Sequence, residues 1–192
     1  MRSFSDMSTV IFVTGNPEKA RHFSQHIGYD IAHRRAELDE IQTLKTDELV
    51  EHKARQAYQQ LQQPVLVEDV SFVCEALGSL PGPFVKFFVE EKNGVENICR
   101  MMDGFASRRA RAQCVFGYFD GNKIRFFEGY TDGAIAQHPR GENGYGFDRI
   151  FEPDGFSGKT AGQLRDEDYD RYYMTIKPFE KVKEFLVNHG LV

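Results

Sequence analysis

The stretch Thr9–Lys19 limits what this chain can fold into more than any other part of it. It begins with Val10–Val13, an apolar run rich in β-branched and aromatic side chains, which predicts a short buried strand. A break follows at Gly15–Pro17, and apolar side chains then recur at helical spacing, at Ala20, Phe23 and Ile27. Asn16 suits the N-cap of that helix, and Pro17 suits its first position, where no backbone N–H is needed. The stretch therefore predicts a strand, a tight turn and a helix.

The first turn of this helix carries a lysine, Lys19. A helix N-terminus offers unpaired N–H groups and the positive end of a dipole, so a cation there is unfavourable unless an anion lies between them. A bound phosphate is one such anion. Lys19 could equally be a solvated surface lysine, because the loop matches neither a Walker loop nor a dinucleotide-binding fingerprint. Both interpretations stay open at this point.

Composition narrows the class of protein. With 192 residues, 41% of them hydrophobic, the chain suits one domain, or two lobes sharing a core. A net charge of −5 argues against a nucleic-acid or anionic-membrane partner. The three cysteines form no CxxC pair, so neither a disulfide framework nor a zinc site is predicted. Residues 1–8 are expected to form a flexible tail, and no signal peptide or membrane span is recognisable, so we expect a reduced cytoplasmic protein.

A weak strand pattern at Tyr29–Arg35 and a polar stretch at Glu37–Gln42 lead into a second helix. This helix begins near Asp47, with Thr46 as its expected cap, and carries an apolar stripe: Val50, Ala54, Ala57 and Leu61. Lys53 lies next to the stripe rather than opposite it. Such a lysine usually extends past the edge of the core into water, and the rarer alternative is that it points into a cleft.

Two acidic residues follow a second short apolar run. Val65–Val67 predicts a buried strand that ends at Glu68 and Asp69. Carboxylates just past the end of a buried strand lie where α/β sheets place their ligand sites, although acids at strand ends commonly face solvent. The strand-like run Ser71–Cys74 follows immediately, and an acid between two apolar runs is less easily assigned to the surface.

A rigid turn at Leu80–Pro83 is predicted to precede two helices, Phe84–Val89 and Val95–Met102. The phenylalanines of the first of these helices, Phe84, Phe87 and Phe88, are expected in the core or at a subunit interface. Judged by itself, Lys86 is expected to be a surface residue.

Two long strands, Arg111–Phe119 and Lys123–Tyr130, flank Asp120-Gly121, which is a strong hairpin signal. Thr131–Gly133 is predicted to be a further turn. Near the C-terminus a last helix carries Phe179, Val182 and Leu186 on one face.

The segment Arg140–Asp148 is the second stretch that looks functional. Its three glycines allow close approach of backbone to a ligand. Tyr145 and Phe147 could stack on a flat ring, and Asp148 could accept hydrogen bonds from ring N–H groups. The alternative is a glycine-rich hairpin with aromatic packing.

Four of these motifs occur together in an order and at separations that resemble the inosine triphosphate pyrophosphatase family, the house-cleaning hydrolases of non-canonical purine nucleoside triphosphates. The motifs are Thr14–Lys19, Val67–Asp69, Leu80–Lys86 and Gly144–Asp148. The likeness covers the chain from Val10 to about Lys159. Each motif alone is weak, but four in register are specific.

The resemblance implies an α/β fold with an elongated central mixed sheet, flanking helices and two lobes around a nucleotide cleft, usually as a homodimer. It also implies Mg²⁺-dependent hydrolysis between the α- and β-phosphates, which yields a nucleoside monophosphate and pyrophosphate. The triphosphate-binding loop is matched by Thr14, Gly15, Asn16 and Lys19. The metal-binding acids are matched by Glu40 and Asp69, and the catalytic roles by Asp69 and Lys19. Further substrate contacts are matched by Lys53, Lys86, Tyr145, Gly146, Phe147 and Asp148.

The sequence departs from the family pattern near its C-terminus. Where the family carries a Lys-Asn pair and then Ser-His-Arg, an ungapped match places Tyr169-Asp170 and Tyr173–Thr175. Arg171 and Lys177 are nearby but do not align. The departure leaves two alternatives to the expected enzyme. One is a nucleotide-binding protein or sensor without turnover, and the other is a pyrophosphatase with shifted base specificity.

Overall fold

Within residues 10–192, the part of the chain that the computed structural model describes, seven strands form one mixed sheet. The strands are β1 (Ile11–Val13), β2 (Ala32–Arg34), β3 (Val65–Cys74), β4 (Pro81–Gly82), β5 (Arg109–Phe119), β6 (Ile124–Ile135) and β7 (Phe151–Pro153). Their order is β2-β1-β3-β5-β6-β7, with β4 paired to β3. The predicted mixed α/β sheet is confirmed. The expected flexible tail at residues 1–8 lies outside the described residues, and the division into two lobes stays a prediction.

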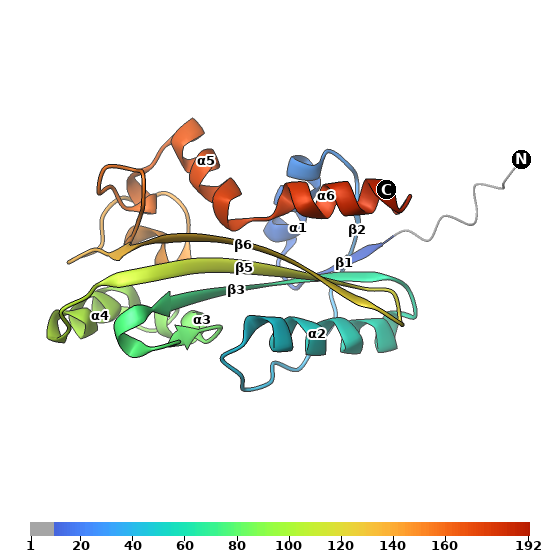
Figure 1. The fold of residues 1–192 in the computed structure, drawn as a ribbon, viewed down its shortest axis with the longest axis horizontal. Helices are drawn as coiled ribbons and strands as arrows, with labels where there is room; N and C mark the ends of the chain where they lie inside the picture. The colour runs from blue at the N-terminus through green and yellow to red at the C-terminus, as the bar shows by residue number, and fades with distance from the viewer. Residues whose placement is uncertain (1–9) are drawn as a thin grey trace, which may run out of the picture.

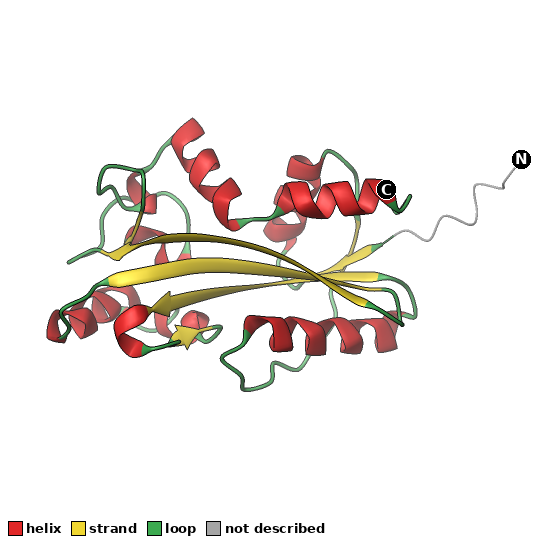
Figure 2. Cartoon of the chain, in the orientation of Figure 1, coloured by secondary structure: helices red, strands yellow, loops and turns green. Residues whose placement is uncertain are grey.

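Helices cover both faces of the sheet, as Figure 1 and Figure 2 show. They are α1 (Pro17–Ile27), α2 (Thr46–Leu61), α3 (Val85–Val89), α4 (Gly94–Met101), α5 (Asp166–Ile176) and α6 (Phe179–Asn188). In Figure 1, α1, α5 and α6 lie on one side of the long strands, and α2 lies on the other. Within residues 10–192, no helix combines the length and the apolar composition that a membrane span requires.

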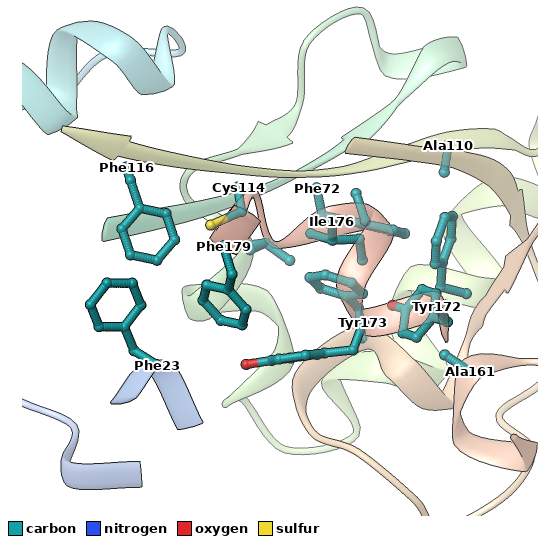
Figure 3. Close-up of a cluster of buried hydrophobic side chains, with 14 of the residues drawn as sticks. Phe23, Phe72, Ala110, Cys114, Phe116, Ala161, Tyr172, Tyr173, Ile176 and Phe179 are labelled. Atoms are coloured by element: carbon teal, nitrogen blue, oxygen red, sulfur yellow. The ribbon is translucent and has the colours of Figure 1, made fainter. Parts of the chain in front are cut away.

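The core divides into two clusters because side chains alternate across the strands. Phe12 and Leu66 point toward α1 and α6, where Phe23, Phe116 and Phe179 pack ring against ring (Figure 3). The neighbouring strand residues pack against α2 on the opposite face; they are Ile11, Val13, Val65 and Val67. The apolar faces predicted for the first and last helices are buried. The face predicted for the second helix is also buried except for Leu61, which is partly buried.

The turn from β1 into α1 has the predicted chemistry. The Oδ1 atom of Asn16 accepts hydrogen bonds from the backbone N–H groups of Glu18, at 3.0 Å, and Lys19, at 3.4 Å. Pro17 occupies the first helical position, and Gly28 ends the helix in the left-handed conformation. The cap on α2 differs from the prediction: the helix begins at Thr46, and its N-cap residue is Lys45, which makes no side-chain capping bond.

β3 is one strand of ten residues, so the prediction that a short strand ends at Glu68 and Asp69 is wrong. All ten residues of β3 pair with β5, from Val65 opposite Phe119 to Cys74 opposite Ala110. β1 pairs with β3 only at Val65 and Leu66 and then ends. The two acids therefore lie in mid-strand, beside the turn that follows the shorter β1.

β6 also runs further than predicted. The hairpin at Asp120-Gly121 is confirmed, but the turn expected at Thr131–Gly133 is part of β6, which pairs with β5 as far as Ala134. Two glycines in this strand permit other segments to pass close by. A Cβ atom on Gly129 would clash with the carbonyl oxygen of Ile176, at the end of α5, and one on Gly133 would clash with Glu152 of β7.

The remaining local predictions hold in part. The expected helices at 84–89 and 95–102 correspond to α3 and α4, and the weak strand at 29–35 is reduced to β2. Phe87 of α3 is 65% exposed and Phe88 is also exposed, so their assignment to the core is wrong. The alternative assignment, to a subunit interface, stays a prediction.

We expect Gly129→Ala to destabilise the protein by about 1–3 kcal/mol, because the new methyl group displaces the end of α5 from the sheet. Gly104→Ala is the matched control, since a Cβ atom there meets no atom within 4 Å. Chemical denaturation of both variants measures the difference. Equal stability of the two would contradict the close contact between α5 and β6.

Candidate active site

A cleft of about 730 Å³ opens where β1 ends beside the longer β3. Its walls come from the turn before α1, the loop before α2, the middle of β3, α3, the segment 145–148 and the end of α5. All the residues singled out from the sequence line it: Thr14, Gly15, Asn16, Lys19, Glu40, Lys53, Asp69, Lys86, Tyr145, Gly146, Phe147 and Asp148. The structure thus brings the candidates together, and their individual roles stay predictions.

The turn Thr14–Asn16 presents the N-terminus of α1 to the cleft. Thr14 Oγ1 accepts a hydrogen bond from the backbone N–H of Asn16 at 3.1 Å, which holds the turn together. The fold itself does not require glycine at position 15, since a Cβ atom there would meet nothing within 4 Å. This end of the cleft is therefore open and lined by backbone and small polar groups.

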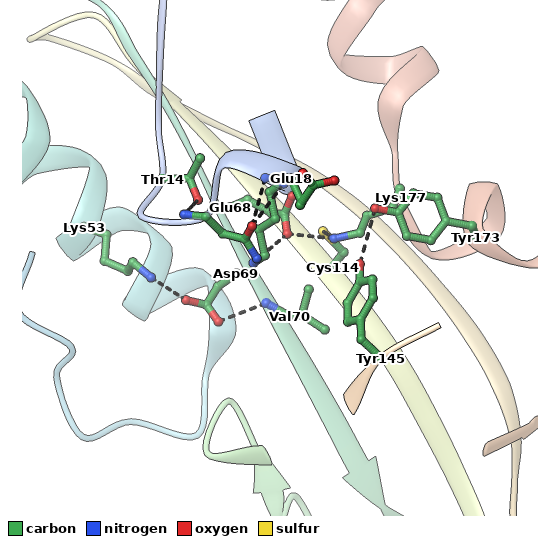
Figure 4. A network of polar contacts seen from close by, with 12 residues as sticks. Thr14, Glu18, Lys53, Glu68, Asp69, Val70, Cys114, Tyr145, Tyr173 and Lys177 are labelled. Carbon is green, nitrogen blue, oxygen red and sulfur yellow. Dashed lines mark hydrogen bonds and ion pairs between the residues drawn. The ribbon is translucent and has the colours of Figure 1, made fainter. Parts of the chain in front are cut away.

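Two lysines that line the cleft share one buried carboxylate, that of Glu68. Figure 4 shows Glu68 and one of these lysines, Lys177. Lys19 Nζ lies 3.1 Å from Glu68 Oε1, and Lys177 Nζ lies 2.7 Å from the same oxygen. The exposed fractions of the side chains are 27% for Lys19, 3% for Glu68 and 4% for Lys177. The charge of Lys19, which needs an anion beside the helix dipole, is therefore already offset within the protein.

The buried pair of Glu68 and Lys177 stays ionised near neutral pH. Burial raises the pKa of Glu68, but the ammonium groups of Lys177 and Lys19 outweigh burial and lower that pKa to about 2. Burial lowers the pKa of Lys177, but its neighbours, Cys114 and Glu68 first, raise it well above the ordinary value. Burial raises the pKa of the Cys114 thiol to about 12, so it stays protonated. At neutral pH the two lysines and Glu68 together carry one net positive charge.

The sequence reasoning missed Glu68 and Lys177 as site residues. Glu68 adjoins Asp69 in an apolar run, which is a usable signal for a buried acid. Lys177 follows α5 and is 109 positions away from Glu68, beyond the part of the chain that carried the family resemblance. No local pattern could have paired the two.

Lys53 points into the cleft. This is the rarer of the two orientations that the sequence left open for it. Its Nζ atom lies 2.7 Å from Asp69 Oδ2 and 3.2 Å from Glu40 Oε1. Burial lowers the pKa of Lys53, but the two carboxylates raise it more, so the group stays charged. The other oxygen of Asp69 accepts the backbone N–H of Val70 at 2.9 Å, which fixes the orientation of the carboxylate.

The same two acids fit a magnesium ion. Across residues 10–192 no group of three or more His, Cys, Asp or Glu side chains is arranged to hold a metal. Mg²⁺ requires fewer protein ligands than such a group provides, because it commonly binds one or two carboxylates together with phosphates and waters. Glu40 and Asp69 already converge on one cationic atom, Lys53 Nζ, so their placement suits that donor set.

The opposite end of the cleft is built around Asp148, which is buried. Its carboxylate accepts hydrogen bonds from the Tyr145 backbone N–H at 3.0 Å, the Tyr169 hydroxyl at 2.9 Å and the Tyr172 hydroxyl at 2.8 Å. Burial raises the pKa of Asp148, and these hydrogen bonds oppose the rise. The carboxylate is thus a rigid acceptor held by tyrosines, and no cationic side chain within residues 10–192 is hydrogen-bonded to it.

The two aromatic candidates of this segment differ. Phe147 is buried and stacks on Phe72, with ring centroids 4.4 Å apart and planes at 16°, so one of its faces is covered. Aromatic packing, the alternative considered for this segment, therefore accounts for Phe147. Tyr145 is 56% exposed and remains the better candidate for stacking on a ligand.

The face that α5 presents to the cleft differs from the ungapped match. Tyr172, Tyr173 and Ile176 line the cleft, and Lys177 follows them. Met174 packs against the core, and the Thr175 hydroxyl donates to the Tyr172 carbonyl at 2.6 Å. Arg171 pairs with Asp168 on the surface. Neither Met174 nor Thr175 lines the cleft, so the two residues that the ungapped match places at family positions are not available to contact a base there.

A model of the Ham1 family matches residues 10–185. The chain belongs to the Ham1 family. A Trypanosoma cruzi (strain CL Brener) member named inosine triphosphate pyrophosphatase 2 is 41% identical over 165 residues, which cover 84% of each chain. A Scheffersomyces stipitis member named inosine triphosphate pyrophosphatase is 36% identical over 197 residues, covering 95% of this chain and all of that one. The resemblance drawn from the four motifs is confirmed.

The fold agrees with this Ham1 membership. The solved structure of a HAM1 protein from Coxiella burnetii superposes with a TM-score of 0.83 at 21% identity. The match covers 95% of this chain and 100% of that chain. At such identity the likeness shows a shared fold.

Acid should destabilise the protein through Glu68. The pKa of Glu68 is about 2 in the folded state against an ordinary value of 4.5, so its stabilising contribution is complete above about pH 4.5 and is lost as the pH falls toward about 2. Between about pH 6 and about pH 3 the loss from this group should be roughly 2 kcal/mol. Denaturant unfolding at both pH values measures it.

The variant with both Glu68→Gln and Lys177→Met is the matched comparison. It lacks the titrating carboxylate and keeps every other acid, including Asp148, whose raised pKa acts in the opposite direction. It should lose roughly 2 kcal/mol less than wild type between the two pH values. An equal loss in both proteins would contradict the role of Glu68.

Proposed function

We propose that the chain is a Mg²⁺-dependent pyrophosphatase of non-canonical purine nucleoside triphosphates such as ITP, dITP and XTP. Water adds across the anhydride bond between the α- and β-phosphates, and the products are a nucleoside monophosphate and pyrophosphate. The observation that carries the proposal is the meeting of Glu40, Asp69 and three lysines with a helix N-terminus in one cleft. Relatives named inosine triphosphate pyrophosphatase support it.

The lysines suit a triphosphate, which carries about four negative charges near neutral pH. Lys19, Lys53 and Lys86 line the same cleft and reach it from α1, α2 and α3. The first backbone N–H groups of α1 add donors and a dipole that favours anions. Lysines held near the phosphates also stabilise charge that develops on the leaving pyrophosphate.

Glu40 and Asp69 would hold the magnesium ion. When bound, Mg²⁺ supplies positive charge against the phosphates and makes water a better nucleophile. Asp69 is the group we assign to orient that water and to accept its proton. Its carboxylate suits this role because one oxygen is fixed by the Val70 N–H and the other faces the cleft beside Lys53.

At the other end we assign the base to Tyr145 and Asp148. The exposed ring of Tyr145 offers a stacking surface, and Gly146 keeps the backbone of this segment accessible from the cleft. Asp148 supplies an acceptor for a ring N–H, held in place by Tyr169 and Tyr172.

Turnover is favoured over a pure binding role. The departure near the C-terminus suggested a sensor, but Met174 and Thr175 lie outside the cleft, so their identities leave the hydrolytic groups intact. A protein that only binds has little use for two acids converging on one cationic position. The departure bears instead on base specificity.

The homodimer and the cytoplasmic location that were expected both stay predictions, and light scattering during gel filtration tests the first.

Asp69→Asn should lower Mg²⁺-dependent release of pyrophosphate from ITP by at least ~10²-fold, because it removes a metal ligand and the proton acceptor. The control is Asp30→Asn, which changes an exposed aspartate outside the cleft. Circular dichroism establishes that both variants are folded. Turnover near the wild-type rate in folded Asp69→Asn would overturn the assignment.

Discrimination between ITP and ATP should be modest. A 6-keto purine needs a donor and a 6-amino purine an acceptor, and the hydroxyl of Tyr173, which lies 3.4 Å from that of Tyr145, can serve as either. One mispaired polar contact costs about 1–3 kcal/mol, or roughly 5- to 150-fold in kcat/KM. Steady-state kinetics with both substrates measures the ratio, and a preference of ~10³ or more would contradict the expectation.

Tyr173→Phe provides a second measurement of the same point. Because the hydroxyl serves both purines, its loss should lower kcat/KM for ITP and ATP by similar factors. Tyr130→Phe, on the exposed part of β6, controls for removal of a tyrosine hydroxyl outside the cleft. A change confined to one substrate would show that Tyr173 selects the base.

A further inference from the structure

Lys19 and Lys177 differ in their freedom although they contact the same oxygen of Glu68. Lys177 is 4% exposed and is enclosed by Cys114, whose Sγ atom lies 3.6 Å from Nζ, and by the ring of Tyr173, 5.7 Å from Nζ. Lys19 is 27% exposed, and it stands in the first turn of α1 at the edge of the cleft. Only Lys19 can leave the carboxylate without losing its access to solvent or to a ligand.

The charges explain why two lysines are needed. A buried carboxylate without a cation is strongly unfavourable, so Glu68 must keep at least one partner at all times. If Lys19 were the only partner, the pair would be neutral and Lys19 would be held by Glu68. With Lys177 present, the cluster keeps one net positive charge, and the carboxylate remains paired when Lys19 turns away.

We propose that Lys177 is a positioning residue for triphosphate binding, which acts by neutralising Glu68 so that Lys19 is available to the phosphates. Lys19 exchanges one anion for another as the triphosphate enters, and Lys177 stays on Glu68. The inference rests on the proposed function, since it assigns the phosphates to Lys19. It gives a role to a lysine that lies one residue beyond α5 and to an acid to which the proposed function assigns no metal.

The test is binding of inorganic tripolyphosphate, measured by calorimetry without metal, so that neither the base nor turnover contributes. Lys177→Met should weaken binding by about 10- to 100-fold, the range for a hydrogen bond between charged groups, because Lys19 is then held by Glu68. In assays with ITP the same variant should raise KM and leave kcat nearly unchanged. Lys123→Met, on the exposed β5–β6 hairpin, controls for the loss of one positive charge.

The decisive variant combines Glu68→Gln with Lys177→Met. It removes both charges of the buried pair and keeps their approximate shapes, so it should fold even if Lys177→Met alone does not. Lys19 is then unpaired, and tripolyphosphate affinity should return to within about threefold of wild type. Adding Lys19→Met to this variant should abolish the recovery.

Other outcomes overturn the inference. If the double variant binds as weakly as Lys177→Met, then Lys177 acts by direct contact with phosphate or only through the fold. If Lys177→Met binds as well as wild type, Glu68 does not hold Lys19. If tripolyphosphate binds wild type and Lys19→Met equally, or binds neither, Lys19 does not hold the phosphates and the inference is overturned. Release of pyrophosphate from ITP in the presence of Mg²⁺ tests the proposed function separately.

Discussion

A carboxylate buried in the middle of the sheet is the constraint on which this site depends. Glu68 is 3% exposed and can remain ionised there only beside cations. It draws one lysine from the first turn of α1 and another from the junction between α5 and α6, two segments that are far apart in sequence. The ion pairs therefore join three parts of the chain at the floor of the cleft, and the same contacts set the charge that an entering anion meets.

β3 continues beyond the end of β1, and this places Glu68 and Asp69 at the cleft. Successive side chains of a strand point to opposite faces, so Glu68 and Asp69 serve different faces of the sheet. Glu68 points with Leu66 toward α1 and α6, whereas Asp69 points with Val67 toward α2 and meets Lys53. Since β1 has ended, both faces open into one cleft. A single dipeptide thus supplies the carboxylate that organises the lysines and the one that faces the metal position.

Local chemistry was predictable from the sequence, and long-range pairing was not. The cap of Asn16 on α1 and the hairpin at Asp120-Gly121 depend on neighbouring residues, and both were predicted correctly. The length of β3 and the continuation of β6 through Thr131–Gly133 depend on pairing with β5, which no local pattern encodes. The pairing of Lys177 with Glu68 was missed for the same reason. The four motifs located the cleft because each contains residue types that suit a triphosphate site. They did not show which charged side chains pair with each other.

The helical phase of α5 decides how the two ends of the cleft differ. Tyr169, Tyr172, Tyr173 and Ile176 recur at the i, i+3, i+4, i+7 spacing of one helix face, and that face meets Asp148 and the cleft. The intervening Met174 and Thr175 face elsewhere, so a comparison residue by residue along this helix misjudges which side chains can touch a ligand. The base end is thereby lined by neutral hydroxyls around one satisfied carboxylate, while the lysines gather at the phosphate end. Because charged contacts contribute more than neutral ones, affinity should come mainly from the phosphates. The base should be distinguished by weaker hydrogen bonds, made by hydroxyl groups that can either donate or accept.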